Sequence, residues 1–235
     1  MRAALFDLDD TLYSEIEFVK SGFRTVARYV SSRYHFNEDL LFTQMLDILQ
    51  REGRGKVFDS LLYSLGIYTE EKVRLLVYLY RSHCPTIHLY EDVLPTLDHL
   101  RCYGMRLGIV TDGMASVQRN KIVALGLESF FDAIVCTDEL GRQCWKPSAG
   151  PYKVALDLFQ VSPSEAVYVG DDPSKDFLGP NSIGMLTIQV KRQIEQNSTP
   201  DVIPEPAGAK FVVKGLGEIL PTIGGKCNAC RKAIY

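Results

Sequence analysis

The chain has 235 residues, of which 46% are apolar, and its mean hydropathy is close to zero. This composition is that of a globular protein with one sizeable core, or one core and a small accessory domain, and it excludes the disordered and fibrous classes. The net charge is −3 with acidic and basic residues interspersed, which argues against nucleic-acid or membrane binding through a basic face. No apolar run approaches the roughly 20 residues of a membrane span, and the first motif leaves no room for a signal peptide, so we expect a cytoplasmic protein.

The first predicted element is a buried strand at residues 3–6, AALF, which leads directly into three aspartates, Asp7, Asp9 and Asp10. Alternation along a strand would place Asp7 and Asp9 on one face and Asp10 on the other. Carboxylates this close repel one another unless a cation binds between them. An oxygen-only ligand set favours Mg²⁺, which keeps several waters and is often shared with a phosphate group.

The next segment, residues 14–90, carries apolar positions at helical spacing, and we expect an all-helical domain inserted after the first strand. Asn37 and Thr69, each followed by acidic residues, are predicted N-caps. A basic stretch between two of these helices contains Arg51, Arg54 and Lys56. These cations are candidates for contact with a phosphorylated or acidic substrate, although an exposed loop with solvated charges is the simpler interpretation.

From residue 91 onward, strand-like and helical segments alternate. This order predicts βαβ units and a Rossmann-like α/β core with a parallel sheet covered by helices. The predicted strands are 106–113, 131–140, 165–172, 185–190 and one that begins at 211; the predicted helices are 91–104, 115–127, 148–159, 173–184 and a short final one. We therefore expect a core at 1–13 and 91–225, a helical cap at 14–90 and a C-terminal tail at 226–235.

Polar groups follow several of the predicted strands. In an open parallel sheet, ligands bind outside the carboxyl ends of the strands. The first strand ends in Asp7, the second in Thr111-Asp112-Gly113 and another in Asp171-Asp172, while a connection between a strand and a helix carries Lys146. The fold would bring these distant segments to one edge of the sheet, where they form the candidate site.

Four of these segments resemble, in order, the four motifs of the haloacid dehalogenase (HAD) superfamily. They are DLDDT, the Thr of IVTDG, the Lys of WKPS and the acids of VGDDPSKD. The resemblance extends from the first motif to about Val190. The helical insertion between motifs one and two also resembles the cap of the family's first subclass.

The resemblance implies roles that agree with the chemistry of these residue types. Asp7 would be the nucleophile that forms an aspartyl-phosphate, and Asp9 would be the general acid and then the general base. The dehalogenases of the family typically lack an acid at the position of Asp9, so its presence favours phosphoryl transfer. The phosphate would be bound by the Thr111 hydroxyl, the Gly113 N–H and the Lys146 ammonium.

The implied metal is Mg²⁺, which would contact the carboxylates of Asp7 and Asp171 and the backbone carbonyl of Asp9. Asp172 and Asp176 would lie on one side of a helix that starts near Pro173 and would orient Asp171, Lys146 or the metal's waters, although Asp172 is also a plausible helix cap. Thr11 is expected to fix its turn through bonds to nearby backbone.

The function indicated by these residues is a Mg²⁺-dependent phosphatase that acts on a small phosphorylated metabolite, as a monomer or homodimer. A phosphomutase on a sugar phosphate, a non-catalytic binding or regulatory module and a haloacid dehalogenase remain as alternatives. Cys227 and Cys230 form a C-x-x-C pair in the tail. Since a structural zinc site needs four ligands, a loose tail with two thiols is the preferred interpretation.

Overall fold

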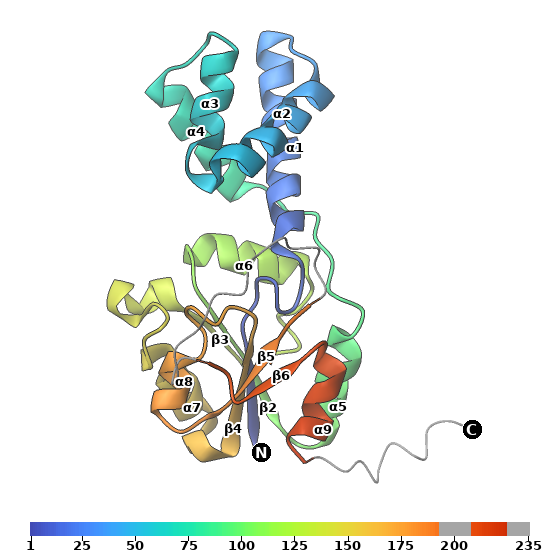
Figure 1. The fold of residues 1–235 in the computed structure, drawn as a ribbon, viewed down its shortest axis with the longest axis vertical. Coiled ribbons are helices and arrows are strands. Elements are labelled where there is room, and N and C mark those ends of the chain that lie inside the picture. Colours follow the sequence, from blue (N-terminus) through green and yellow to red (C-terminus); the bar gives the residue numbers. More distant parts are fainter. Residues whose placement is uncertain (193–207, 225–235) are drawn as a thin grey trace, which may run out of the picture. The chain divides into compact units, whose positions relative to one another are not determined.

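The computed structural model describes residues 1–192 and 208–224 (Figure 1). Cys227 and Cys230 lie outside the described residues. The chain divides into two compact units, one formed by Met1–Ser14, Leu89–Gln118 and the chain from Gly126 onward, the other by Glu15–His88 and Arg119–Leu125. The second unit thus also contains 119–125, which the sequence patterns did not assign to the helical domain.

The first unit is built on one sheet of six strands in the order β3-β2-β1-β4-β5-β6. All neighbouring strands are parallel, which confirms the expected Rossmann-like α/β fold. The strands are β1 (Ala3–Phe6), β2 (Arg106–Thr111), β3 (Ala133–Cys136), β4 (Ala166–Gly170), β5 (Leu186–Val190) and β6 (Phe211–Val213). The central strands β1 and β4 are buried along their whole length, as their continuous apolar sequences require.

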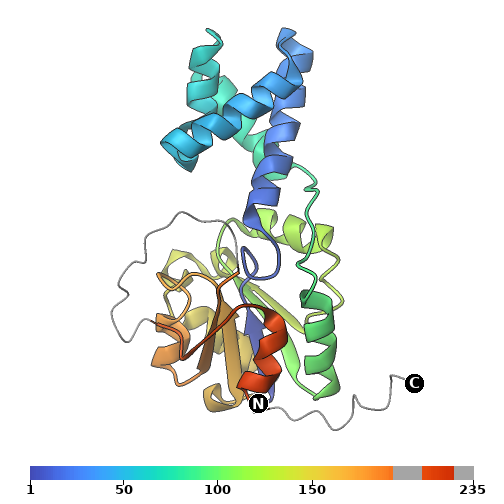
Figure 2. The same cartoon turned by 45° about the vertical axis from the view of Figure 1, so that its right-hand side comes forward.

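Helices α5 (Val93–Cys102), α7 (Gly150–Phe159), α8 (Leu178–Ser182) and α9 (Ile219–Thr222) belong to the first unit. Helix α6 (Ala115–Ala124) begins in the first unit and ends in the second. Figures 1 and 2 show α7 and α8 on one face of the sheet and α5 and α9 on the other. The core beneath α7 joins Tyr152, Leu156 and Phe159 to Leu5 and Tyr168 of the central strands.

Two predicted elements differ from the structure. The strand expected at 131–140 ends at Cys136, and Thr137–Leu140 form a 3₁₀ turn. The helix expected from Pro173 begins only at Leu178. The reason is a local turn, because the Asp172 carboxylate accepts hydrogen bonds from the backbone N–H and the hydroxyl of Ser174.

In the second unit, the segment Glu15–His88 carries α1 (Glu15–Tyr34), α2 (Glu38–Glu52), α3 (Val57–Ser64) and α4 (Glu70–Ser82) (Figure 2). Both predicted N-caps are confirmed: the side chain of Asn37 accepts from Leu40 N and that of Thr69 from Lys72 N. The apolar faces of these four helices form a separate core around Phe23, Met45, Leu61 and Leu76. Among the described residues, no helix is long and apolar enough to cross a membrane.

Candidate active site

The candidate site lies at the carboxyl ends of the three central strands. The strand register pairs Phe6 with Ile109 on β2 and with Val169 on β4. The residues that follow therefore meet at one edge, and Asp7 N continues the ladder by donating to Val169 O at 2.8 Å. Carboxylate oxygens of Asp7, Asp171 and Asp176 all lie within 4.8 Å of one another. Segments about 170 residues apart in sequence thus form one acidic cluster.

The expected self-repulsion among these acids is visible in their electrostatics. Burial raises the pKa of Asp7 to about 6, although the Lys146 ammonium acts in the opposite direction. Burial, followed by the charge of Asp7, raises the pKa of Asp171 to about 8. Both acids therefore bind protons more tightly than isolated aspartates, and a cation between them would relieve the same repulsion.

Lys146 is the cation of this cluster and is completely enclosed. Its Nζ donates to Asp7 Oδ1 at 2.7 Å, to Asp176 Oδ1 at 2.9 Å and to the hydroxyl of Tyr168 at 2.7 Å. Burial disfavours its charge, but Asp176 and Asp7 together raise its pKa well above the ordinary value. The lysine is thus charged, and all three of its ammonium hydrogens have acceptors.

Asp176 completes this arrangement. Its Oδ1 accepts from Lys146 and from the Tyr168 hydroxyl, and its Oδ2 accepts from Asp172 N at 3.0 Å. Burial would raise the pKa of Asp176, but Lys146 holds it below the ordinary value. A Cβ at Gly170 would lie 2.6 Å from Asp176 Oδ2, so only glycine leaves room for this carboxylate beside β4. Asp172 and Asp176 lie together as their i,i+4 spacing predicts, with Asp176 N donating to Asp172 O at 2.9 Å, but they do so in a turn before α8 and not in a helix that starts near Pro173.

Two residues near the motifs make contacts that differ from those expected. The Thr11 hydroxyl donates to Asp171 Oδ1 at 3.2 Å, whereas the sequence suggested bonds to nearby backbone. Asp112, which was left without a role, accepts from the Thr137 hydroxyl at 2.6 Å and from Lys146 N at 3.2 Å. Asp112 therefore fixes the backbone from which Lys146 reaches Asp7.

The first motif also departs from a simple strand. β1 ends at Phe6, and Asp10 adopts a left-handed conformation with φ 53°, so the alternation predicted through Asp10 does not continue. Asp9 instead lies in a loop where Tyr13 and Gln118 donate hydrogen bonds to its carboxylate. Gln118 also donates to the Thr111 hydroxyl at 2.6 Å. Gly113 has a φ of 115° beside the Gln118 side chain, a conformation that favours glycine.

The sequence patterns did not identify four of these residues near the site, namely Tyr13, Gln118, Tyr168 and Lys175. Lys175 Nζ lies 3.9 Å from Asp172 Oδ2. Burial lowers the pKa of Lys175, but nearby negative charge, chiefly that of Asp7, raises this pKa above its ordinary value. The one signal that could have identified Lys175 is its position inside the fourth motif. Tyr168 sits within an ordinary apolar strand sequence, and nothing local distinguishes it.

The three basic residues proposed for selectivity belong to the helical unit. Arg54 forms a two-pronged ion pair with Glu15, with both nitrogen–oxygen distances at 2.6 Å. Arg51 Nε donates to Asp47 O at 3.4 Å, and Lys56 is exposed. Arg54 is therefore occupied within its own unit.

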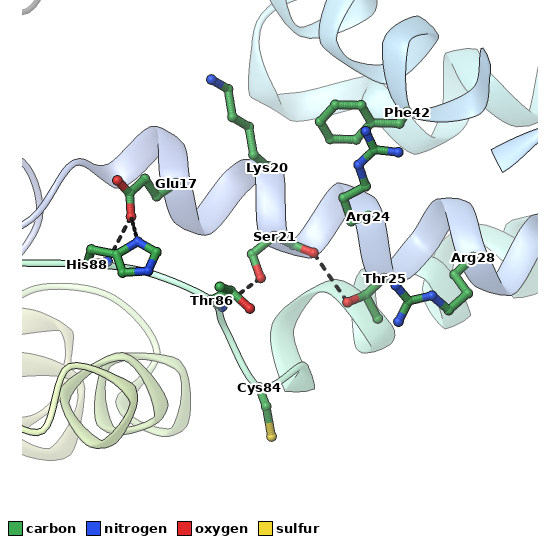
Figure 3. A pocket seen from close by; sticks show the side chains of 10 residues that line it. All are labelled: Glu17, Lys20, Ser21, Arg24, Thr25, Arg28, Phe42, Cys84, Thr86 and His88. Atoms are coloured by element: carbon green, nitrogen blue, oxygen red, sulfur yellow. Dashed lines mark hydrogen bonds and ion pairs between the residues drawn. The ribbon is translucent and has the colours of Figure 1, made fainter. Parts of the chain in front are cut away.

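The helical unit also contains a cavity of about 470 Å³ along α1 (Figure 3). Its cations include Arg24, which donates to Asp39 at 2.6 Å and stacks over Phe42. The cavity is also lined by Cys84, Thr86 and His88, which lie in the segment that follows α4. His88 N donates to Glu17 Oε2 of α1 at 2.8 Å. These contacts fasten the returning chain to α1, and none of the motif residues lines this cavity.

The acidic cluster has the donors that a divalent cation requires. Asp7 Oδ2 is buried and, among the described residues, accepts no hydrogen bond. Asp171 lies beside Asp7, and burial, followed by the negative charge of Asp7, raises the pKa of Asp171 to about 8. Hard carboxylate oxygens of this kind suit Mg²⁺. The residues present therefore fit a divalent cation beside Asp7, Asp171 and Asp176.

Metal-free protein should lose stability as the pH rises. The ordinary aspartate pKa is 3.8, whereas the folded values for Asp7 and Asp171 are about 6 and about 8. Between these limits the folded state binds more protons than the unfolded state, so the free energy of unfolding falls from about pH 4 to pH 8. Because one pKa unit corresponds to about 1.4 kcal/mol, the two groups together would lower the free energy of unfolding by roughly 9 kcal/mol at most, and we expect the melting temperature to fall throughout this pH range.

Thermal melts between pH 5 and 9, with and without MgCl₂, measure this linkage. Magnesium should raise the melting temperature more at pH 8.5 than at pH 5, and Asp171→Asn should reduce both the pH slope and the magnesium effect. Asp157→Asn, an exposed aspartate on α7, is the matched control and should retain both. Equal magnesium shifts in the wild type and in Asp171→Asn would contradict the assignment of Asp171.

The chain is similar to a family of hydrolases and to two phosphatases of known name. The family described as haloacid dehalogenase-like hydrolase matches residues 4–190. A glyceraldehyde 3-phosphate phosphatase of Methanopyrus kandleri is 33% identical over 215 residues, which cover 87% of this chain and 91% of the relative. The pyrophosphatase PpaX of Bacillus pumilus is 28% identical over 231 residues, covering 95% and 97%. The crystal structure of a HAD phosphatase from Thermococcus onnurineus matches with a TM-score of 0.63 at 27% identity, covering 96% and 99%.

Proposed function

Because this chain belongs to the haloacid dehalogenase-like hydrolases, we propose that it is a Mg²⁺-dependent phosphatase that hydrolyses a small phosphorylated metabolite. Asp7 is the nucleophile of this proposal. Its Oδ1 is held by Lys146 at 2.7 Å, while its Oδ2 accepts no hydrogen bond from the described residues. Oδ1 is thus held in place, and Oδ2 is the oxygen left to attack the phosphorus. This difference between the two oxygens is the observation that carries the proposal.

The reaction would proceed in two displacements. Asp7 attacks the phosphorus while Asp9 gives a proton to the departing alcohol oxygen, and an aspartyl-phosphate forms. Asp9 then takes a proton from the water that attacks this intermediate and releases phosphate. The Thr111 hydroxyl and the Gly113 N–H would bind the phosphoryl oxygens as charge develops on them, and Lys146 would exchange one of its three acceptors for a phosphoryl oxygen.

Magnesium would bind to the carboxylates of Asp7 and Asp171 and to the Asp9 backbone carbonyl. When bound, it would neutralise charge between the nucleophile and the phosphoryl group. Two further residues would position this set. Thr11 would orient Asp171, to which it donates, and Asp176 would orient Lys146, from which it accepts. Asp172 contributes by capping the turn that carries Asp176.

The substrate we propose is a small phosphate monoester, with a triose phosphate as the first compound to test. The relatives support this class, since one is named a glyceraldehyde 3-phosphate phosphatase. The helical unit would act as a cap that restricts access and contributes selectivity. Of its three candidate cations, Arg51 and Lys56 are favoured for substrate contact, because Arg54 would first have to leave Glu15.

Phosphate release from a substrate panel tests the proposal. The purified protein is incubated with triose, hexose and nucleoside phosphates and with pyrophosphate, in MgCl₂ and separately in EDTA. We expect magnesium-dependent release, highest for a small monoester. Preference for pyrophosphate would favour the activity in the name of the Bacillus relative. Isomerisation of a hexose phosphate without release would indicate a mutase, and absence of release from every compound would contradict the proposal.

A further inference from the structure

The Asp9 carboxylate is held by two buried side chains from different segments. Gln118 Nε2 on α6 donates to Asp9 Oδ2 at 2.8 Å, and the Tyr13 hydroxyl donates to Asp9 Oδ1. Gln118 is 2% exposed and Tyr13 is fully buried, so packing fixes both donors. The loop that carries Tyr13 is itself joined to Leu89 by a β-bridge. Contacts on both oxygens therefore define the orientation of this carboxyl group.

The same amide also reaches the phosphate-binding threonine. Gln118 Nε2 donates to the Thr111 hydroxyl oxygen at 2.6 Å. An amide nitrogen carries two hydrogens, one for each of these acceptors, and an ionised Asp9 can only accept. Because the Thr111 oxygen accepts from Gln118, its own hydrogen is directed to another acceptor. One buried amide thus sets the hydrogen-bond direction of both neighbours.

We propose that Gln118 is a positioning residue that orients Asp9 for proton transfer and Thr111 for phosphate binding, an inference that rests on the proposed phosphatase function. An amide N–H₂ donates and cannot accept, so Gln118 holds Asp9 Oδ2 as an acceptor. The Tyr13 hydroxyl can either donate or accept, so it can contact Oδ1 in the ionised and in the protonated carboxyl group. Because Gln118 occupies Oδ2, Oδ1 is the oxygen that exchanges the proton in this proposal.

The proton balance follows directly. With Oδ1 protonated, the proton passes from Oδ1 to the departing alkoxide as the Asp7–phosphorus bond forms and the ester P–O bond breaks. Asp9 is then ionised, and the Tyr13 hydroxyl donates to Oδ1. The water that attacks the aspartyl-phosphate returns one proton to Oδ1 as the Asp7–phosphorus bond breaks. Throughout both steps, Gln118 holds Oδ2.

Leaving-group dependence separates this role from a merely structural one. An alkyl phosphate needs a proton on its departing oxygen, whereas 4-nitrophenyl phosphate releases a stable phenolate without one. In Gln118→Met, we expect kcat/KM for the alkyl ester to fall about 100-fold further than for the nitrophenyl ester. KM should rise for both esters, because Thr111 loses its alignment. In Tyr13→Phe, the alkyl-specific loss should appear without the general rise in KM.

Gln143→Met is the matched control, since Gln143 is exposed and donates to Leu140 O; its kinetics should equal those of the wild type. Equal losses for both esters in Gln118→Met and in Tyr13→Phe would overturn the inference while leaving the phosphatase proposal intact. If Gln118→Met does not fold, as judged by circular dichroism, Tyr13→Phe decides alone. A wild-type protein that cleaves neither ester would contradict the proposed function itself, and with it this inference.

Discussion

Replacing Asp7 by Asn is expected to reduce phosphate release by a factor of about 10⁴ or more. An amide is a far weaker nucleophile than a carboxylate, and the substitution also removes one charge from the set proposed to bind magnesium. The fold should persist, because Lys146 retains Asp176 and Tyr168 as partners. Since burial raises the pKa of Asp7 to about 6, its ionised form destabilises the metal-free protein above that pH. The metal-free variant should therefore melt at the wild-type temperature or above it at pH 7.5.

The measurement combines steady-state phosphate release with mass spectrometry of acid-quenched protein. Wild-type protein and Asp9→Asn should carry a phosphoryl group on the peptide that contains Asp7, and Asp7→Asn should not. Asp98→Asn, an exposed aspartate on α5, serves as the matched control and should match the wild type in both assays. Turnover that survives in Asp7→Asn would rule out the covalent route.

The location of the candidate site could be predicted because Asp7 and Asp171 directly follow recognisable strands. The buried run Ala3–Phe6 has an all-apolar signature, and the residue after it, Asp7, must emerge at the strand's carboxyl end. The same reasoning applies to Asp171 after β4. A parallel sheet then brings these ends together whatever their separation in sequence. The alternation of strands and helices was likewise sufficient for the fold class.

The partners of these residues could not be predicted in the same way. Tyr168 and Gln118 each make two side-chain hydrogen bonds in the site, and such bonds leave no periodic pattern in the sequence. The turn that replaces the first part of the expected helix before α8 depends on Asp172 bonding to Ser174, a local competition that the apolar pattern does not record. The sequence suggested no role for Asp112 for a related reason, since its partners Thr137 and Lys146 lie in a later connection.

Lys146→Met is expected to lower the free energy of unfolding of metal-free protein by about 3–5 kcal/mol at pH 7.5. The substitution removes the ammonium that both Asp7 and Asp176 contact, and it leaves their charges buried without a partner. Phosphate release should also fall by about 10²–10³-fold, as for the loss of one donor to a developing charge. Denaturant unfolding and the phosphate assay measure the two effects separately.

The charge interpretation of this variant can be tested by removing a carboxylate as well. Asp176→Asn alone should be destabilising, because it deprives the buried Lys146 of its strongest counter-charge. In the double variant with Lys146→Met, the combined loss should be smaller than the sum of the single losses, because no unpaired charge remains at position 176. Lys153→Met, an exposed lysine on α7, should change stability by no more than about 0.5 kcal/mol. Strict additivity of the two buried substitutions would mean that the ammonium acts by packing alone, and the electrostatic account of the site would then fail.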